Sequence, residues 1–214
     1  MRTWIKFCGT TCLEDAMASI DAGVDALGFI FAPSQRCITP ERAREIIREL
    51  PGHIERIGVF LNQGAEQISN LVNEVELSGL QLHGEESPPE IYVHLDPERR
   101  GCLRKIKTVL VEDGFQRKID DYSAMPEAVD TWLLDSGAGS GRTFDWHLAR
   151  AQLGDRKGPF IVAGGLTPGN VAEALREFHP WGVDVVSGVE SRPGRKNPEK
   201  MKAFVAAVRK AESD

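Results

Sequence analysis

The sequence predicts an α/β protein, a single-domain (β/α)8 TIM barrel, because a short apolar run followed by an amphipathic stretch recurs eight times along it. The apolar runs are rich in β-branched and aromatic residues and end in Gly or polar residues, which is typical of buried parallel strands. The length of 214 residues suits one compact domain, which we expect to span residues 1–214. The alternative is a doubly wound open sheet, but such a sheet would rarely need eight units in so short a chain.

Eight strands are expected at residues 4–8, 26–31, 56–61, 79–83, 103–109, 131–135, 160–163 and 183–187. Eight helices are expected at residues 14–22, 40–50, 65–76, 89–95, 115–122, 146–153, 168–178 and 198–212. Prolines crowd the fourth of these helices and close the fifth. Side chains that suit N-caps precede four of the helices: Thr39, Asp145, Thr167 and Asn197.

The composition excludes several function classes. The net charge is -6 and no long run of Lys and Arg occurs, so nothing favours binding to nucleic acid or to an anionic membrane. The N-terminal residues lack an apolar signal region, and no stretch approaches 18 apolar residues, so we expect a cytoplasmic protein. The four cysteines are expected to be reduced, and Cys8 and Cys12 have no His or Cys partner at zinc spacing, so no metal is expected.

Polar residues occur where the apolar runs end, which is the place where barrel enzymes carry their chemistry. Such residues end or nearly end five runs, and one more lies in a following loop: Cys8, His83, Lys107, Asp135, Ser187 and Arg36. A ring of polar strand ends indicates an active site at one rim of the barrel.

Side chains alternate between the two faces of a strand, so the apolar Phe7 is expected to face the helices and Lys6 and Cys8 the barrel interior. The same alternation points Leu80 and Leu82 outward and Gln81 and His83 inward. In the sixth strand it points Leu133 and Asp135 inward. We therefore expect Cys8, His83 and Asp135 to converge near the barrel axis.

Two Gly-containing segments follow the last two expected strands, at residues 163–166 and 187–190, and a third follows Asp135 at residues 137–141. Glycine lets the backbone approach an anion closely, and backbone N–H groups bind phosphate without a charged side chain. The loops after strands seven and eight commonly bind phosphate in such barrels. We therefore expect a phosphate site formed by Gly164, Gly165, Ser187 and Gly188.

These residues lie within longer motifs, which are, in chain order, Lys6-Phe-Cys-Gly-Thr-Thr, Gly23-Val-Asp-Ala-Leu-Gly-Phe-Ile-Phe, Ser34-Gln-Arg36, Leu80-Gln-Leu-His-Gly84, Leu134-Asp135, Gly139-Ser-Gly-Arg-Thr-Phe-Asp-Trp146, Ala163-Gly-Gly-Leu-Thr-Pro-Gly-Asn170 and Val183-Asp-Val-Val-Ser-Gly-Val-Glu190. Over essentially the whole chain they resemble the phosphoribosylanthranilate isomerase family of tryptophan biosynthesis.

The resemblance implies an Amadori rearrangement of N-(5'-phosphoribosyl)anthranilate to 1-(2-carboxyphenylamino)-1-deoxyribulose 5-phosphate, without a cofactor. It implies that Asp135 is the general acid, Cys8 the general base, and Arg36 the residue that binds the anthranilate carboxylate. His83 is interpreted either as a substrate contact or as a hydrogen-bonded interior residue. The expected partner is this small phosphorylated substrate, and the sequence leaves open whether the protein is a monomer or a homodimer.

These roles require shifted pKa values. An Asp with an ordinary pKa of about 3.9 is ionised at neutral pH, and a free Cys ionises only near about 8.5. Burial would raise the pKa of Asp135, and we expect the charge of Lys6 to lower that of Cys8.

The chain departs from the family pattern at two positions. Val186 stands where the family has Ser, and Cys37 replaces an aromatic residue that follows Arg36. Three alternatives remain: the histidine-pathway ProFAR isomerase, an isomerase that accepts both substrates, and a catalytically silent phosphate-binding barrel. Cys8 argues against the first, because that family has Asp there, and the intact Cys8, Asp135 and Arg36 argue against the last. The direct roles of Lys6, Lys107 and Asp184 are left open.

Overall fold

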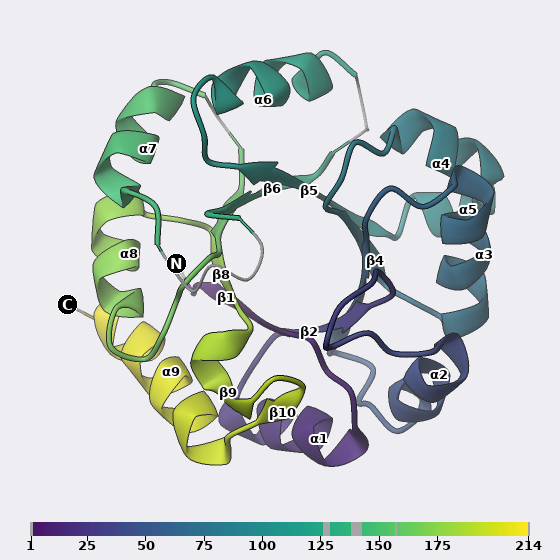
Figure 1. Ribbon diagram of the computed structural model, residues 1–214, viewed down its shortest axis with the longest axis horizontal. Helices are drawn as coiled ribbons and strands as arrows, with labels where there is room; N and C mark the ends of the chain where they lie inside the picture. The colour runs from purple at the N-terminus through teal and green to yellow at the C-terminus, as the bar shows by residue number, and fades with distance from the viewer. Residues whose placement is uncertain (1, 126–128, 138–142, 157, 214) are drawn as a thin grey trace.

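The computed structural model describes residues 2–125, 129–137, 143–156 and 158–213. Eight parallel strands pair in chain order, and the eighth pairs with the first, which closes the barrel. Figure 1 shows these strands as a ring that is surrounded by helices. The closed parallel barrel confirms the predicted fold class and excludes the open sheet.

The barrel strands are β1 Trp4–Cys8, β2 Ala26–Ile30, β3 Glu55–Phe60, β4 Gly79–Leu82, β5 Arg104–Leu110, β6 Thr131–Asp135, β7 Phe160–Val162 and β8 Gly182–Val185. The helices are α1 Leu13–Ala22, α2 Pro40–Arg48, α3 Ala65–Val75, α4 Pro88–His94, α5 Pro97–Arg100, α6 Phe115–Ser123, α7 Trp146–Leu153, α8 Val171–Phe178 and α9 Pro198–Ala211. The short helix α5 was not predicted. Its N-cap is Asp96, whose side chain accepts a hydrogen bond from the Glu98 N–H.

Three of the four predicted N-caps are confirmed. Thr39, Asp145 and Asn197 each accept a hydrogen bond from the backbone N–H three residues later. The prediction for Thr167 is wrong, because α8 begins only at Val171. The side chain of Asn170 instead accepts a hydrogen bond from the Thr167 N–H, which holds residues 167–170 in a turn before the helix.

The core has two layers, as the strand alternation predicts. Phe7, Leu80, Leu82 and Leu134 face outward into the cluster shared with the helices, where Phe7 packs edge-on against Phe204 of α9. A second buried cluster fills the barrel interior and consists of Trp4, Ala26, Ile57, Ile106, Leu133, Ile161 and Ala163. This interior cluster supports the polar residues at the C-terminal end of the strands.

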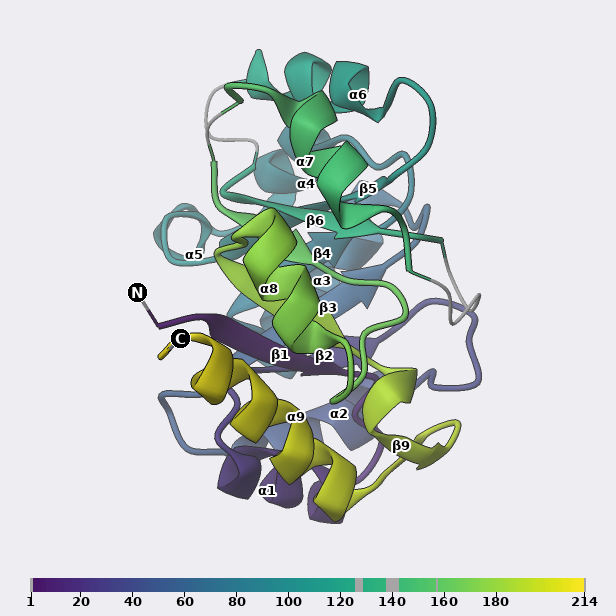
Figure 2. The ribbon, with the colours of Figure 1, turned by 90° about the vertical axis from the view of Figure 1, so that its left-hand side faces the viewer.

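The two chain ends lie at the mouth where the strands begin, and the strand β9 lies at the opposite mouth (Figure 2). A hydrogen bond of 2.8 Å from Arg209 Nη1 to Thr3 O joins the terminal segments. No helix in the described ranges is long and apolar enough to cross a membrane.

The segment between β8 and α9 differs from the prediction. The eighth strand ends at Val185, two residues early, and the 3-10 helix η1, Ser187–Val189, follows it. The short antiparallel strands β9, Glu190–Arg192, and β10, Arg195–Lys196, then form a hairpin that was not predicted. Runs of two or three residues carry too little periodicity to be recognised in a sequence.

Candidate active site

The candidate side chains lie at the C-terminal ends of the strands or in the loops that follow them. Cys8 is the last residue of β1 and Asp135 the last residue of β6. His83 directly follows β4, and its N–H donates to Phe60 O on β3 at 3.0 Å. Arg36 lies in the loop between β2 and α2. His83 interacts electrostatically with Asp135, and Arg36 with Cys8, so all four belong to one mouth of the barrel.

Cys8 occupies space that a glycine on the neighbouring strand leaves free. Its side chain is buried, and a Cβ atom on Gly28 would lie 2.6 Å from its Sγ. Burial raises the pKa of the Cys8 thiol, although the positive charges of Lys6 and Lys196 act to lower it. The expectation for Lys6 therefore has the correct sign but is outweighed by burial.

A polar layer crosses the barrel interior just below Cys8. Lys6 Nζ donates to Asp184 Oδ2 at 3.0 Å and to Gln81 Oε1 at 2.9 Å, and Gln81 Nε2 donates to Thr108 Oγ1 at 3.2 Å. Burial acts to lower the pKa of Lys6, but the attraction of Asp184 and Cys8 outweighs it, so the pKa is raised. The inward directions predicted for Lys6 and Gln81 are confirmed. Within the described residues, the buried Oδ1 of Asp184 has no hydrogen-bond partner.

Asp135 and His83 influence each other across the mouth. Burial raises the pKa of the Asp135 carboxyl, while a hydrogen bond of 2.9 Å from the Gly137 N–H to Oδ1 opposes the rise. Burial lowers the pKa of His83, which the negative charges of Asp135 and Glu86 oppose. The pair therefore tends toward a neutral imidazole beside a carboxyl group that is harder to ionise than usual.

Arg36 is held by a carboxylate from the unpredicted hairpin. Its Nε donates to Glu190 Oε1 at 2.8 Å and its Nη2 to Glu190 Oε2 at 2.7 Å, which is the bidentate geometry of a strong ion pair. Its side chain is 18% exposed, and a Cβ on Gly9 would lie 2.8 Å from Arg36 Cδ. The Glu190 carboxylate therefore engages the Nε and Nη2 atoms of Arg36, and the Arg36 side chain lies against Gly9, directly after β1.

Lys107 does not belong to the ring of polar strand ends. It lies in the middle of β5, and its neighbour Ile106 faces the barrel interior, so Lys107 faces the helices. Its Nζ donates to Gly84 O and lies 3.7 Å from Glu86 Oε2. It also makes a cation–π contact with Tyr122, 5.0 Å from the ring centre. The alternation rule applied to Ile106 would have excluded it from the ring.

The loops after β7 and β8 pack closely against each other. Gly164 and Gly165 have left-handed backbone angles, with φ of 79° and 65°, which favour glycine. A Cβ on Gly188 would lie within 1.9 Å of Leu166 O, so no larger residue fits there. Ser187 and Gly188 are the first residues of η1, where a helix leaves its N–H groups without internal acceptors. Gly188 thus lies against the loop after β7, and all four predicted phosphate residues are at least partly exposed. Residues 138–141 of the third Gly-rich segment lie outside the described residues.

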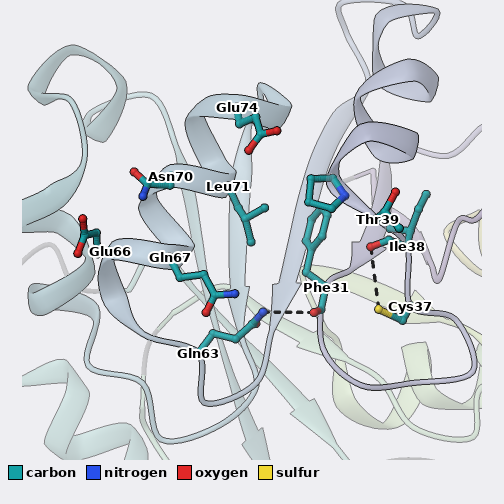
Figure 3. Close-up of a pocket in the computed structure, with 11 residues that line it drawn as sticks. Phe31, Cys37, Ile38, Thr39, Gln63, Glu66, Gln67, Asn70, Leu71 and Glu74 are labelled. Carbon is teal, nitrogen blue, oxygen red and sulfur yellow. Dashed lines mark hydrogen bonds between the residues drawn. The ribbon is translucent and has the colours of Figure 1, made fainter.

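One cavity is lined by outer helices and loops and not by the candidate acid and base. It measures about 620 Å³ and lies between α2 and α3, with Glu66, Asn70 and Glu74 on one side and Cys37 and Ile38 on the other (Figure 3). Neither Cys8, His83 nor Asp135 lines it. Cys37, one of the two departures from the family pattern, is exposed at its edge. Within the described ranges, no group of three or more His, Cys, Asp or Glu side chains is placed to hold a metal ion.

The sequence reasoning missed two buried charged residues near Cys8 and Arg36, namely Glu190 and Lys196. Glu190 ends a quoted motif, but nothing in the sequence tells which cation it pairs with. Lys196 lies nine residues after η1 begins, in a segment that resembles an ordinary polar loop. The Arg192-Pro-Gly-Arg195 turn signal between them would have indicated a hairpin.

A closed parallel barrel with buried ionisable side chains gathered at its C-terminal mouth defines a (β/α)8-barrel enzyme. Sequence comparison identifies its kind. The family model for N-(5'phosphoribosyl)anthranilate (PRA) isomerase matches residues 5–207. The chain therefore belongs to the PRA isomerase family, whose members are enzymes.

Individual relatives agree with this assignment over nearly their whole length. The N-(5'-phosphoribosyl)anthranilate isomerase of Pelobacter propionicus is 39% identical over 213 residues, which cover 98% of this chain and 97% of that protein. The isomerase of Moorella thermoacetica is 44% identical over 210 residues, covering 97% and 90% of the two chains.

Solved structures are similarly close. The phosphoribosyl anthranilate isomerase of Thermotoga maritima superposes with a TM-score of 0.84 at 39% identity, covering 97% of this chain and 99% of that chain. A phosphoribosyl anthranilate isomerase solved in complex with reduced 1-(o-carboxyphenylamino)-1-deoxyribulose 5-phosphate gives a TM-score of 0.83 at 37% identity, with the same coverage.

Proposed function

We propose that the protein catalyses the Amadori rearrangement of N-(5'-phosphoribosyl)anthranilate to 1-(2-carboxyphenylamino)-1-deoxyribulose 5-phosphate in tryptophan biosynthesis. The observation that carries the proposal is the placement of Cys8 and Asp135 at the ends of β1 and β6, at one mouth of the barrel. Membership of the PRA isomerase family supports the choice of substrate.

Asp135 acts as the general acid. It protonates the ribose ring oxygen, so that the furanose opens and a Schiff base forms between the sugar C1 and the anthranilate nitrogen. The raised pKa of Asp135 supports this role, because a larger fraction of the carboxyl group keeps its proton.

Cys8 acts as the general base. Its thiolate removes the C2 proton of the Schiff base, and the resulting enol becomes the ketone of the product. The positive charges of Lys6 and Lys196 favour the thiolate against the cost of burial.

The two roles need a protonated Asp135 and an ionised Cys8 at the same time. Burial raises both pKa values, so in this arrangement it favours the protonated Asp135 and opposes the ionised Cys8. The fraction of protein in this arrangement rises when the pKa of Asp135 rises and when the pKa of Cys8 falls. Burial of Asp135 acts in the first direction, and the lysines near Cys8 act in the second.

The remaining residues bind the two ends of the substrate. Arg36 presents its free edge to the anthranilate carboxylate, since the Glu190 pair fixes the plane of its guanidinium. The backbone N–H groups of Gly165, Ser187 and Gly188 bind the phosphate, and the partly buried His83 contacts the sugar between them.

The test is a direct assay. Freshly generated phosphoribosylanthranilate is offered to the purified protein, and the loss of its fluorescence is followed. A parallel assay with the histidine-pathway substrate measures whether the other aglycone is turned over. Turnover of phosphoribosylanthranilate alone is expected; turnover of neither substrate would leave a silent barrel, and turnover of only the second would reassign the enzyme.

A further inference from the structure

Lys196 is a buried lysine whose ammonium group is shared among three separate parts of the mouth. Its Nζ donates to Cys8 O at 2.5 Å and to Val186 O at 3.3 Å, and lies 3.5 Å from Glu190 Oε1. Cys8 ends β1, Val186 lies between β8 and η1, and Glu190 holds Arg36. One side chain therefore joins the ends of the first and last barrel strands to the hairpin.

The three oxygens match the hydrogen-bonding capacity of a charged lysine. An ammonium group has three donors and no acceptor, whereas a neutral amine would direct a lone pair at one of these oxygens. Burial lowers the pKa of Lys196, and the negative charge of Glu190 opposes this. The side chain of Lys196 is 1% exposed and that of Glu190 3%, so solvent screens this charge only weakly.

The backbone around Lys196 is fixed independently of its side chain. The Lys196 N–H donates to Asp15 Oδ2 at 2.8 Å, and Gly194 N–H donates to Glu190 Oε1 at 3.2 Å. Thr11 Oγ1, in the loop after β1, donates to Gly194 O at 2.7 Å. The hairpin is therefore anchored to the first βα unit, and its lysine is held at the end of β1.

Four charged groups from different elements act on the Cys8 thiol. Lys6 lies on the same strand, Asp184 on β8, Lys196 on β10 and Arg36 in the loop after β2. Asp184 disfavours the thiolate, and Lys6 is already paired with Asp184 at 3.0 Å. Lys196 therefore supplies positive charge near the thiol that does not belong to the Lys6–Asp184 pair.

We propose that Lys196 is a positioning residue for Cys8, which fixes the end of β1 that carries the thiol and stabilises the thiolate by its charge. The proposal rests on the proposed function, in which Cys8 is the general base. Lys196 does not touch the reacting atoms, because it reaches Cys8 from the backbone side. Its role is thus to hold Cys8, the loop after β8 and the Arg36–Glu190 pair in one arrangement.

The test compares Lys196→Met with Lys200→Met. Lys200 is a matched control, because it is an exposed lysine near the start of α9 that also contacts Glu190. Its Nζ donates to Glu190 O at 2.8 Å, and it does not reach Cys8. Both variants retain Arg36 opposite Glu190, so the carboxylate keeps a cation. Folding is checked by circular dichroism, and Lys196→Gln is the second variant should the methionine be poorly accommodated.

Two quantities are measured. The first, which needs no substrate, is the pH at which iodoacetamide alkylates Cys8 at half its maximal rate, followed by mass spectrometry of the peptide that contains Cys8. The second is kcat across the same pH range. In Lys196→Met we expect the alkylation midpoint to move to higher pH and the plateau of kcat to fall, by about 10²-fold if the thiol is also displaced by about 1 Å.

The two measurements separate the possible failures. If wild-type protein does not turn over phosphoribosylanthranilate, the proposed function fails while the alkylation midpoint still decides the role of Lys196. An unchanged alkylation midpoint in folded Lys196→Met overturns the proposal, whatever happens to kcat. Such a result would mean that Lys196 is only structural and that its charge does not act on the Cys8 thiol. An equal shift in Lys200→Met overturns it as well, since the effect would then not depend on the contact with Cys8.

Discussion

The ends of β1 and β6 place two ionisable side chains at the same mouth in different electrostatic surroundings. Cys8 at the end of β1 is buried among the cations Lys6, Lys196 and Arg36, which act against the effect of burial on the thiol. At Asp135, at the end of β6, burial is opposed by the hydrogen bond from the Gly137 N–H and then by His83 and Lys6, and burial raises the pKa of this carboxyl group as it raises that of the thiol.

This difference suits the proposed roles of the two residues, in which Asp135 must be protonated and Cys8 ionised, the reverse of their ordinary states at neutral pH. Burial disfavours charge in both residues, which helps an acid that must keep its proton and hinders a base that must lose it. The β1 side therefore needs compensating cations and the β6 side does not. Lys6 acts on both groups, whereas Lys196 lies against the end of β1 and acts on Cys8.

The largest expected effect comes from removing either partner of this pair. Cys8→Ala and Asp135→Asn should each lower kcat by about 10²–10⁴-fold with little change in KM, because a general acid or base acts only in the transition state. Cys8→Ser should fail as well, since a hydroxyl group is a far weaker acid than a thiol. The measurement is steady-state kinetics on folded variants, with the exposed Cys102→Ala as the control. Near-normal kcat in Cys8→Ala would contradict the base assignment and direct attention to Lys6 or His83.

A larger residue at Gly28 should displace Cys8 on β1 and leave Asp135 on β6 in place. In Gly28→Ala the new Cβ would lie 2.6 Å from Cys8 Sγ and 3.0 Å from Lys6 Cε, so the thiol must move. We expect kcat to fall by about 10²-fold, as for a displacement of about 1 Å, and the protein to lose about 1–3 kcal/mol of stability. Gly52→Ala is the control, because a Cβ there meets nothing within 4 Å. Unchanged kinetics in Gly28→Ala would mean that the position of Cys8 is not critical.

Arg36 is proposed to bind the anthranilate carboxylate, a part of the substrate that does not react. Arg36→Met should raise KM by about tenfold or more and lower kcat less, since a lost hydrogen bond to a charged group costs about 1.5–3 kcal/mol in ground and transition states alike. Arg42→Met, which removes an exposed pair with Glu45 on α2, should change neither constant. A loss confined to kcat would assign Arg36 to the chemical step instead.

The smallest effect is the pH dependence of the wild-type enzyme. The requirement for a protonated Asp135 and an ionised Cys8 predicts a bell-shaped profile of kcat/KM. The acid limb follows Asp135 and lies above the ordinary value of about 4, and the alkaline limb follows Cys8 and lies above about 8.5, because burial raises both pKa values. The measurement is kcat/KM across pH with enzyme stability checked at each point. A fall in kcat/KM at neutral pH would contradict the assignment of the alkaline limb to a Cys8 thiol with a raised pKa.

Local sequence patterns were sufficient for the barrel and for most side-chain directions. The strict alternation in β1, β4 and β6 predicted that Lys6, Gln81 and Leu133 face inward, because a residue's neighbour in a strand must face the other layer. The same rule, had it been applied from Ile106, would have turned Lys107 outward. Element ends were less certain, as β8 and α8 show, since turns and 3-10 helices depend on contacts with other loops.

The sequence by itself determined the eight strand–helix units and the ends of β1 and β6, where Cys8 and Asp135 lie, because these follow from local periodicity and from turn chemistry within a few residues. It did not determine that Glu190 would hold Arg36, or that Lys196 would lie against Cys8, 188 residues away along the chain. Those contacts exist only because β8 closes on β1 and brings the C-terminal hairpin over the first strand. The direction of the Cys8 pKa was likewise decided by the tertiary structure, since burial and four charges from different elements are brought together only when the barrel closes.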